Sequence, residues 1–560
     1  MRRTVNILSL AVILCGLSCQ ALAADWSAPD DGPRIVNIVN FIRLLEPRDE
    51  AITEDVLFQT VVHQVQLMQK HRLPGTFLLQ YDALVDERYQ TLLRELPRDQ
   101  FEIGGWWELP RPLVEKAGLR WRGRYPWDWH ANVGFASGYT PAEREKLVDV
   151  YMADFREAFG YYPKSVASWF IDAHTLKYMS DKYGIVASAN CKDQVGTDGY
   201  TLWGGYWNQA YYPSRLNAYM PAQTEAGQIP VPIFRMLGSD PLRQYDTGVG
   251  HTHQGVITLE PVYGDSGGDR TWVDWYFQNF VRGECLAFNY AQVGQENSFT
   301  WGAMRRGLEY QFPLIARLRD EGELRVETLA QSGQWYRSTY RTTPATAVTC
   351  QSALHDDTRQ TVWFNSRYYR ANLIWEDGTL RVRDIHLFDE SVQSPILQNK
   401  IDEPAVQFYT LPFVDGYYWS SQDQLAGLRP MIHAGGEDVT LTGQQPVISR
   451  TESGDLRVVW PLTNSKGALA ITFGEDSLHM VLEGASTPWW LELVTDERVN
   501  LPFTEVAGRS LSGYFQGTTY KIAVTPGTFE QRGRRIIIRP ESNALALRLS
   551  ARADRDSQAD

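Results

Sequence analysis

Acidic side chains follow several apolar runs within the first 300 residues, at points where a buried strand would end. The ionisable residues in these positions are Asp82, Glu108, Asp172 with His174, Asp193 and Glu296. Hydrolysis of a glycosidic bond requires two carboxyl groups, one protonated as general acid and one ionised as nucleophile or base. The pattern therefore favours a glycoside hydrolase that needs neither a metal nor another cofactor.

Specific roles follow from the neighbours of these acids. We expect Asp172 to act as nucleophile or base, Glu108 or Glu296 as the acid, and His174 to tune the neighbouring carboxylate. Glu108 is the favoured acid because burial beside Trp106 and Trp107 would raise its pKa. The three residues Glu108, Asp172 and His174 are then expected to face one pocket. An acid at a strand end can instead cap the next helix, and Asp172 directly precedes a helical pattern.

Aromatic residues are frequent, with 19 Trp and 28 Tyr, and many lie in two long segments at residues 121–130 and 203–215. Sugar rings pack well on indole faces, so both segments are predicted to border a carbohydrate site. The expected substrate-binding residues are Asn40, Asp82, Trp106, Trp107, Trp129, His130, Trp203, Trp207, Arg215 and Gln295. Arg215, helped by Arg235, would suit an acidic sugar. The alternative is that Arg215 makes an internal ion pair.

Two other functions remain open. His251 and His253 lie one residue apart and could hold a metal with one of the acids, as in a deacetylase acting on acetylated sugars. A non-catalytic glycan-binding protein would keep the aromatic residues without a facing carboxylate pair. The expected partner in all three cases is an oligosaccharide or polysaccharide. A net charge of −13 argues against nucleic acid, because phosphate binding requires a basic surface.

Strand and helix patterns alternate over the first part of the chain, as in strand-helix units around a parallel sheet. The expected strands cover residues 34–43, 76–81, 101–107, 165–171, 185–190, 231–237, 285–291 and 324–329. The expected helices cover residues 54–71, 88–96, 140–159, 175–182 and 301–320. This order predicts a distorted seven- or eight-stranded (β/α) barrel, which places strand-end residues on one rim.

After residue 342 the pattern changes to short alternating strands and turns without a helix, which predicts an all-β sandwich. We place the barrel at residues 24–342, the sandwich at 343–549 and a disordered tail at 550–560. The three cysteines beyond residue 23, at positions 191, 285 and 350, are expected to be buried apolar side chains.

The first 23 residues have the charged, apolar and small-residue regions of a cleaved secretory signal, ending at Ala23. A lipoprotein cysteine at Cys19 is the alternative. No later segment has the roughly 20 apolar residues needed to cross a bilayer. We therefore expect a periplasmic or extracellular protein.

The layout resembles the barrel enzymes that include glycoside hydrolase families thirty-eight and fifty-seven and the polysaccharide deacetylases. The matching features are the distorted barrel, an acid after the fourth strand at Asp172, and the run from Trp335 to Tyr340 with Thr343 and Pro344 before an all-β region. Residues 102–108, 127–138, 168–174 and 199–215 also resemble a poorly characterised set of bacterial secreted proteins. The resemblance implies a sugar hydrolase.

The first strand departs from these families. Family fifty-seven carries a histidine there, and family thirty-eight and the deacetylases hold a metal through Asp and His, whereas residues 37–41 here read Asn-Ile-Val-Asn-Phe. The resemblance therefore does not assign a metal.

Overall fold

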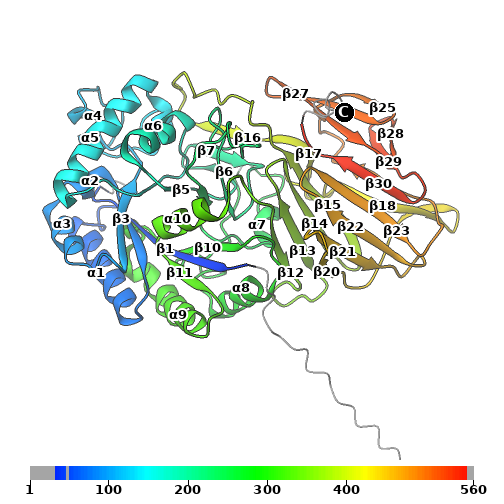
Figure 1. Cartoon of the computed structure of the whole chain (residues 1–560), viewed down its shortest axis with the longest axis horizontal. Coiled ribbons are helices and arrows are strands. Elements are labelled where there is room, and N and C mark those ends of the chain that lie inside the picture. Colours follow the sequence, from blue (N-terminus) through cyan, green and yellow to red (C-terminus); the bar gives the residue numbers. More distant parts are fainter. Residues whose placement is uncertain (1–31, 46–48, 252, 552–560) are drawn as a thin grey trace, which may run out of the picture.

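A computed structural model describes residues 32–45, 49–251 and 253–551 of the chain. The expected signal peptide and residues 552–560 of the expected tail lie outside the described residues. Helices and parallel strands make up the N-terminal part, and antiparallel sheets make up the C-terminal part (Figure 1). No helix within the described ranges is both long and apolar enough to cross a membrane.

A mostly parallel sheet forms the centre of the N-terminal part, with the order β10-β1-β2-β3-β4-β5-β9-β8. Only β8 is antiparallel to its neighbour, and β11 also pairs with β1. The strands are β1 (Arg34–Ile42), β2 (Gly75–Leu79), β3 (Phe101–Trp106), β4 (Ser165–Ala167), β5 (Ala187–Asn190), β8 (Ala210–Tyr211), β9 (Ile233–Arg235), β10 (Asn289–Val293) and β11 (Arg325–Glu327). All residues of β1, β2 and β10 are buried, as expected for parallel strands covered on both faces.

The sheet curves into a barrel that stays open between β8–β9 and β10, since no strand pairing joins these edges among the described residues. The side chain of Gln209 bridges part of this opening by donating to Asn289 at 3.0 Å. The predicted fold class, a distorted (β/α) barrel followed by an all-β sandwich, is confirmed.

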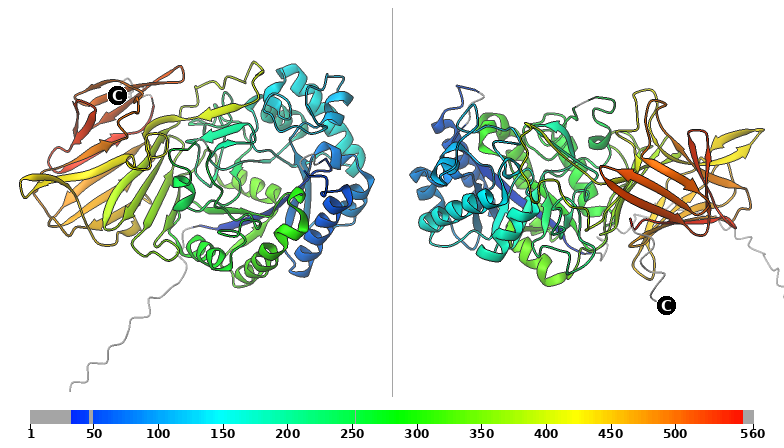
Figure 2. Two further views of the ribbon diagram at one scale, coloured as in Figure 1. Left: turned by 180° about the vertical axis from the view of Figure 1, so that it is seen from behind. Right: turned by 90° about the horizontal axis from the view of Figure 1, so that it is seen from above.

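Helices surround the barrel, as the two further views also show (Figure 2). They are α1 (Glu54–Lys70), α2 (Tyr81–Leu84), α3 (Glu87–Arg94), α4 (Arg111–Lys116), α5 (Pro141–Phe159), α6 (Ala173–Tyr183), α7 (Arg243–Asp246), α8 (Arg270–Arg282), α9 (Thr300–Asp320) and α10 (Leu329–Thr339), with 3-10 turns η1 (Ala136–Gly138) and η2 (Asn297–Phe299). The start of α5 follows the sequence closely: Thr140 and Glu143 form a capping box, with Pro141 at the first helical position.

Two antiparallel sheets form the C-terminal part. The first contains β12 (Thr346–Cys350), β13 (Gln360–Asn365), β14 (Tyr369–Glu376), β15 (Thr379–Leu387), β17 (Leu411–Asp415), β18 (Gly427–Ala434), β19 (Glu437–Thr440), β24 (Trp489–Val494), β28 (Thr528–Arg532) and β29 (Arg535–Arg539). The second contains β20 (Val447–Arg450), β21 (Leu456–Pro461), β22 (Ala468–Phe473), β23 (Ser477–Glu483), β25 (Phe503–Ala507), β26 (Ser510–Phe515), β27 (Thr518–Val524) and β30 (Ala544–Arg548). Phe364 stacks on Phe473 and connects their cores.

A small third sheet joins the two parts of the chain. Strand β16 (Val406–Tyr409) pairs in parallel with β7 (Tyr200–Trp203), which is also antiparallel to β6 (Gln194–Thr197). Nearby, the rings of Trp207 and Trp363 stack with their centroids 3.7 Å apart. The segment around residues 194–211 is therefore packed between the barrel and the sandwich.

The three cysteines at positions 191, 285 and 350 are buried and free, which confirms the prediction.

Candidate functional site

One cavity opens at the carboxyl ends of the barrel strands, where β1, β3 and β10 end. Its lining residues are Arg43, Glu108, Trp127, Trp129, Phe135, Trp169, Gln194, Thr197, Asp198, Tyr200, Leu237, Val256, Glu260, Tyr263, Glu296 and Phe299. The cavity has a volume of about 70 Å³, enough for several water molecules. It brings together carboxyl groups and aromatic rings from distant parts of the sequence.

Arg43 connects two of these carboxyl groups. Its Nη2 lies 3.3 Å from Glu108 Oε2 and 2.8 Å from Glu296 Oε2. All three side chains are buried. The two oxygens are therefore no more than about 6 Å apart, an upper limit that includes the spacing of about 5–5.5 Å between the carboxyl groups of retaining glycosidases.

The two glutamates have different surroundings. Burial raises the pKa of Glu108 to about 7, although Arg43 acts in the opposite direction, and the charge of Glu296 adds to the increase. Among the described residues, Glu108 Oε1 has no hydrogen-bond partner of good geometry. Glu296 accepts hydrogen bonds from Arg43 and from the Ser298 hydroxyl. The pair thus offers one carboxyl group, Glu108, that can stay protonated near neutral pH, and a second, Glu296, that accepts hydrogen bonds from a guanidinium and a hydroxyl.

Arg43 is held by contacts to its backbone. The side chain of Asn297 accepts from Arg43 N at 3.0 Å and donates to Arg43 O at 2.8 Å. Asp82 accepts from the backbone N–H groups of Leu44 and Leu45 at 3.1 and 2.8 Å. Burial raises the pKa of Asp82 to about 6. Asp82 therefore positions the loop that carries Arg43 and does not line the cavity itself.

The aromatic segment at residues 121–130 forms a wall of the cavity through Trp127 and Trp129. The Arg43 guanidinium lies 4.0 Å from the centroid of the Trp127 ring. Behind this wall, His130 Nδ1 lies 2.5 Å from Asp128 Oδ1. Burial opposes ionisation of Asp128, but hydrogen bonds from Arg124 and His130 outweigh it and lower its pKa to about 2. His130 therefore braces the wall rather than facing the cavity.

Gln295 lies behind the cavity. Its side-chain Nε2 donates to Glu260 Oε1 at 2.9 Å, and its side-chain Oε1 accepts from Glu296 N at 2.8 Å. Thr258 donates to the other oxygen of Glu260 at 2.8 Å. Gln295 therefore fixes the relative positions of two carboxyl groups that line the cavity.

Asp172 and His174 are not brought to this cavity. Asp172 caps α6, accepting from Thr175 N at 2.9 Å, and pairs with the buried Arg144 at 3.0 Å. His174 lies in the first turn of α6, and its Nε2 is 3.0 Å from Glu145. The expectation that both residues share a pocket with Glu108 is wrong, because the polypeptide turns into the helix at Asp172 and uses its carboxylate as the cap.

The other predicted binding residues lie in the core or between the two parts. Trp106 stacks on Phe41 and Trp107 packs on Tyr151. Asn40 accepts from Gln64 within the barrel. Trp203 donates to Asp415, Trp207 stacks on Trp363, and Asp193 pairs with Arg235. The large apolar rings of these tryptophans are buried against other aromatic residues, which explains why they do not border the cavity.

Arg215 is exposed and lies away from the cavity. Its Nε donates to the carbonyl of Gln228 at 2.8 Å, and its backbone N–H donates to Gly227. Arg215 therefore braces its own loop, as in the alternative drawn from the sequence. It does so by bonding to backbone carbonyl groups and not by forming an internal ion pair. Arg235 is buried and lies 2.7 Å from Asp193.

The residues of the described ranges do not match the metal site of the deacetylase hypothesis. They contain no group of three or more His, Cys, Asp or Glu side chains suited to hold an ion. His251 and His253 are both exposed, and His251 Nε2 lies 2.8 Å from Gln422 Nε2. A Zn²⁺ site needs three or four such donors converging on one point. The described residues do not supply such a set of donors around His251 and His253.

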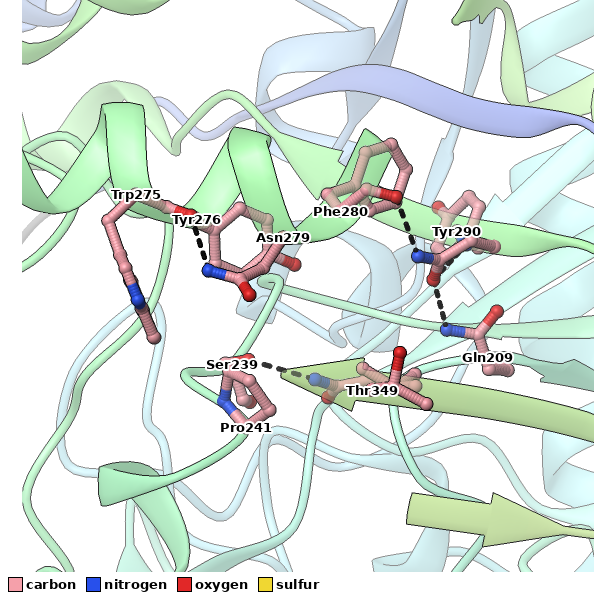
Figure 3. Close-up of a pocket in the computed structure, with 12 residues that line it drawn as sticks. Gln209, Ser239, Pro241, Trp275, Tyr276, Asn279, Phe280, Tyr290 and Thr349 are labelled. Atoms are coloured by element: carbon pink, nitrogen blue, oxygen red, sulfur yellow. Dashed lines mark hydrogen bonds between the residues drawn. The ribbon is translucent and has the colours of Figure 1, made fainter. Parts of the chain in front are cut away.

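A second cavity, of about 20 Å³, lies at the opening of the barrel between α8, β10 and β12 (Figure 3). Amide side chains border it, but they bond to neighbouring groups: Asn279 donates to Trp275 O at 2.9 Å, and Gln209 donates to Asn289 at 3.0 Å. Its volume suits one or two water molecules. It contains none of the carboxyl groups needed for acid–base chemistry.

Sequence reasoning missed Arg43, Asn297 and Glu260. Arg43 directly follows β1, and the rule that marks acids at strand ends does not mark a cation in the same position. Glu260 follows β9 by 25 positions in an irregular segment, so no strand pattern marks it. Only the fold brings these residues to Glu108.

No protein-family model matches the chain, and no curated protein matches it. Among solved structures, the chain is similar to a provisional glycoside hydrolase/deacetylase from Parabacteroides distasonis, with 16% identity and a TM-score of 0.51. The match covers 68% of this chain and 91% of that one. This likeness supports the barrel and its extension into the β-rich part.

Other solved structures match with lower TM-scores. A provisional polysaccharide deacetylase from Mycobacterium smegmatis has 11% identity and a TM-score of 0.34, covering 56% of this chain and 93% of that one. A 4-alpha-glucanotransferase from Thermococcus litoralis has 10% identity and a TM-score of 0.30, covering 92% and 99%. Families thirty-eight and fifty-seven are not identified by these comparisons.

Proposed function

We propose that this chain is a carbohydrate-active hydrolase that cleaves glycosidic bonds in the cavity at the barrel rim. One observation carries the proposal: Glu108 and Glu296 contact the same nitrogen of Arg43, and burial raises the pKa of Glu108 to about 7. A carboxylic acid beside a carboxylate is the pair that glycoside hydrolysis requires. The aromatic walls suit the apolar faces of a sugar ring.

The proposed reaction uses both glutamates in turn. Glu108 gives its proton to the glycosidic oxygen as the bond to the anomeric carbon breaks, while the Glu296 carboxylate attacks that carbon and forms a glycosyl ester. Water then attacks the same carbon, Glu108 takes a proton from it, and Glu296 is released. We base the retaining route on the upper limit of about 6 Å between the two Oε2 atoms, since inversion needs carboxyl groups about 6.5–9.5 Å apart.

Removal of acetyl groups from a sugar is the second candidate. It is supported by the likeness to the Parabacteroides distasonis structure, whose description includes both activities. The two reactions release different products, because glycoside hydrolysis creates new reducing ends and deacetylation creates acetate.

The test is a screen of the full chain against labelled glycans, with separate assays for reducing ends and acetate, each with and without chelator. New reducing ends that persist in chelator, and that are lost in both Glu108→Gln and Glu296→Gln, would support the proposal. Release of acetate alone would reject glycoside hydrolysis in favour of the second candidate.

Replacing Asp172 with asparagine should affect stability rather than turnover. Asparagine can still cap α6, but the change removes the carboxylate charge that faces the buried Arg144. We expect the free energy of unfolding to fall by about 1–3 kcal/mol. Denaturant unfolding measures this loss, and assays on folded protein should give nearly wild-type turnover. A large loss of turnover at unchanged stability would return Asp172 to the reaction.

A further inference from the structure

Among the described residues, carboxyl groups outnumber cationic groups along the lining of the candidate cavity. Its lining includes four carboxyl groups, from Glu108, Asp198, Glu260 and Glu296, and one guanidinium, from Arg43. Arg43 already contacts Glu108 and Glu296. Asp198 is exposed at the mouth, whereas Glu260 is buried inside. Glu260 is therefore the carboxyl group whose charge needs explanation.

Glu260 is held in place by neutral groups. Thr258 Oγ1 donates to its Oε2 at 2.8 Å, and Gln295 Nε2 donates to its Oε1 at 2.9 Å. Among the described residues, no cationic side chain lies within 4 Å to form an ion pair with it. Burial raises the pKa of Glu260, although Lys192 acts in the opposite direction through space. A buried carboxylate without an ion-pair partner is costly, so a bound cation would stabilise its charged form.

The position of Glu260 relates it to the proposed reaction. The Gln295 side chain bonds both the Glu260 carboxyl group and the backbone N–H of Glu296, and both glutamates line the cavity. Tyr263 also lines the cavity. Burial is the main reason why the pKa of its hydroxyl is raised, and the charges of Glu260 and Glu296 add to this effect. A cation bound at Glu260 would therefore be a substituent of the same sugar ring whose glycosidic bond is broken. The ring of Tyr263 would lie beside this cation.

A second feature indicates that the cavity receives a polar ligand. Glu108 Oε1 is buried, and within the described part of the chain it makes no hydrogen bond of good geometry, although the Trp106 indole interacts with the Glu108 carboxyl group closely enough to act against the rise in its pKa. Buried polar atoms normally have a partner, and a hydroxyl or glycosidic oxygen of a bound sugar would supply one. The ligand would thus contact Glu108 on one side and Glu260 on the other.

We propose that the sugar ring bound in this cavity carries a free amino group, and that Glu260 binds its ammonium form. This inference rests on the proposed function for placing a sugar in the cavity. It assigns Glu260 to substrate selection, since neutral and N-acetylated rings lack the positive charge that the carboxylate would pair with.

Binding measurements test the inference without requiring turnover. The probes are glucosamine and galactosamine, compared with glucose, galactose and their N-acetylated forms, at pH 6.5, where the amino groups are protonated. The proteins are the full chain, Glu260→Gln, and Glu102→Gln as a matched control. Glu102 is half-buried in β3 and does not line the cavity; it accepts from Ala330 N, and desolvation raises its pKa as well.

We expect one of the amino sugars to bind the wild type and the Glu102→Gln control at least about tenfold more tightly than its neutral and acetylated counterparts. Glu260→Gln should lose this preference. Equal binding of all probes by the wild type, no detectable binding, or an unchanged preference in folded Glu260→Gln would overturn the inference. The wild-type comparison decides alone if Glu260→Gln fails to fold.

The outcome is separable from that of the proposed function. Glycan cleavage without a preference for amino sugars would reject the amino-sugar inference and leave the hydrolase proposal standing. A preference that depends on Glu260, in a protein that releases no reducing ends from amino-sugar glycans, would support the binding role and reject glycoside hydrolysis.

Discussion

Replacing Glu108 with glutamine is expected to lower kcat for glycan cleavage by about 10²- to 10⁴-fold, the usual contribution of a general acid. Glutamine keeps the shape of the side chain but cannot give a proton to the leaving oxygen. The loss should be much smaller for an aryl glycoside whose leaving group departs without protonation. Comparing kcat on the two kinds of substrate therefore distinguishes a lost proton donor from a distorted cavity.

The pH dependence of the wild type gives a second test of the same role. Glu108 is active as an acid in its protonated form, and its pKa is raised to about 7 by burial. Activity should therefore be present below this value and fall as the pH rises through about 7. Glu108→Gln should lack this decline on the aryl glycoside, because glutamine does not titrate. Glu102→Gln should retain both the wild-type rate and its decline.

Unchanged turnover in Glu108→Gln, or a wild-type pH profile that stays flat across neutral pH, would remove Glu108 from the reaction. If Glu296→Gln were inactive in the same assays, Glu260 would become the candidate general acid, because it is the third buried carboxyl group among the described residues that line the cavity.

The order of the barrel was predictable because local patterns dominate it. The predicted strands at residues 34–43 and 101–107 correspond to β1 and β3, and the predicted helix at 140–159 corresponds to α5. Apolar runs, a capping box and a proline at the helix start depend only on neighbouring residues. In contrast, α8 and α10 were missed, although Asp269 caps α8 and Thr328 forms a capping box with Gln331 at the start of α10.

The candidate site was predicted in part for a related reason. Glu108 and Glu296 were identified because both follow strands that end at one rim. Asp172 satisfies the same rule, but Arg144 and the start of α6 use its carboxylate, and these contacts are invisible in a strand pattern. Arg43 was missed because its significance comes from two carboxyl groups 65 and 253 positions away.

At the junction between the barrel and the sandwich, the buried Arg370 of β14 lies between two aspartates. Its Nε and Nη2 donate to the two oxygens of Asp384 at 2.8 and 2.9 Å, and its Nη1 donates to Asp193. Asp193 follows barrel strand β5 and also pairs with Arg235 at 2.7 Å. One guanidinium thus connects a charged group of the barrel to one of the sandwich.

Replacing Arg370 with methionine is expected to lower the free energy of unfolding by about 3–5 kcal/mol, because breaking a buried ion pair leaves its partners without compensation. Asp384 would keep the hydroxyl of Tyr245 at 2.8 Å, and Asp193 would keep Arg235. Thermal and denaturant unfolding measure the loss. Arg381→Met is the matched control: Arg381 is a buried arginine of β15 that pairs with the half-buried Glu376, so its loss should cost less.

The effect should also depend on pH in a defined direction. Burial opposes ionisation of Asp193, but Arg370 and Arg235 outweigh it and lower its pKa below the usual value of 3.8. The stability this group contributes is therefore present above about pH 4 and lost as the pH falls through the lowered pKa. Without Arg370, Asp193 can be protonated at a higher pH, so the difference between variant and wild type should shrink in acid. The guanidinium of Arg370 also lies among the aromatic rings of Trp203, Trp207 and Trp363, and methionine removes these contacts. If variant and wild type differed in free energy of unfolding by the same amount at pH 7 and below pH 4, the destabilisation would be attributed to this lost packing.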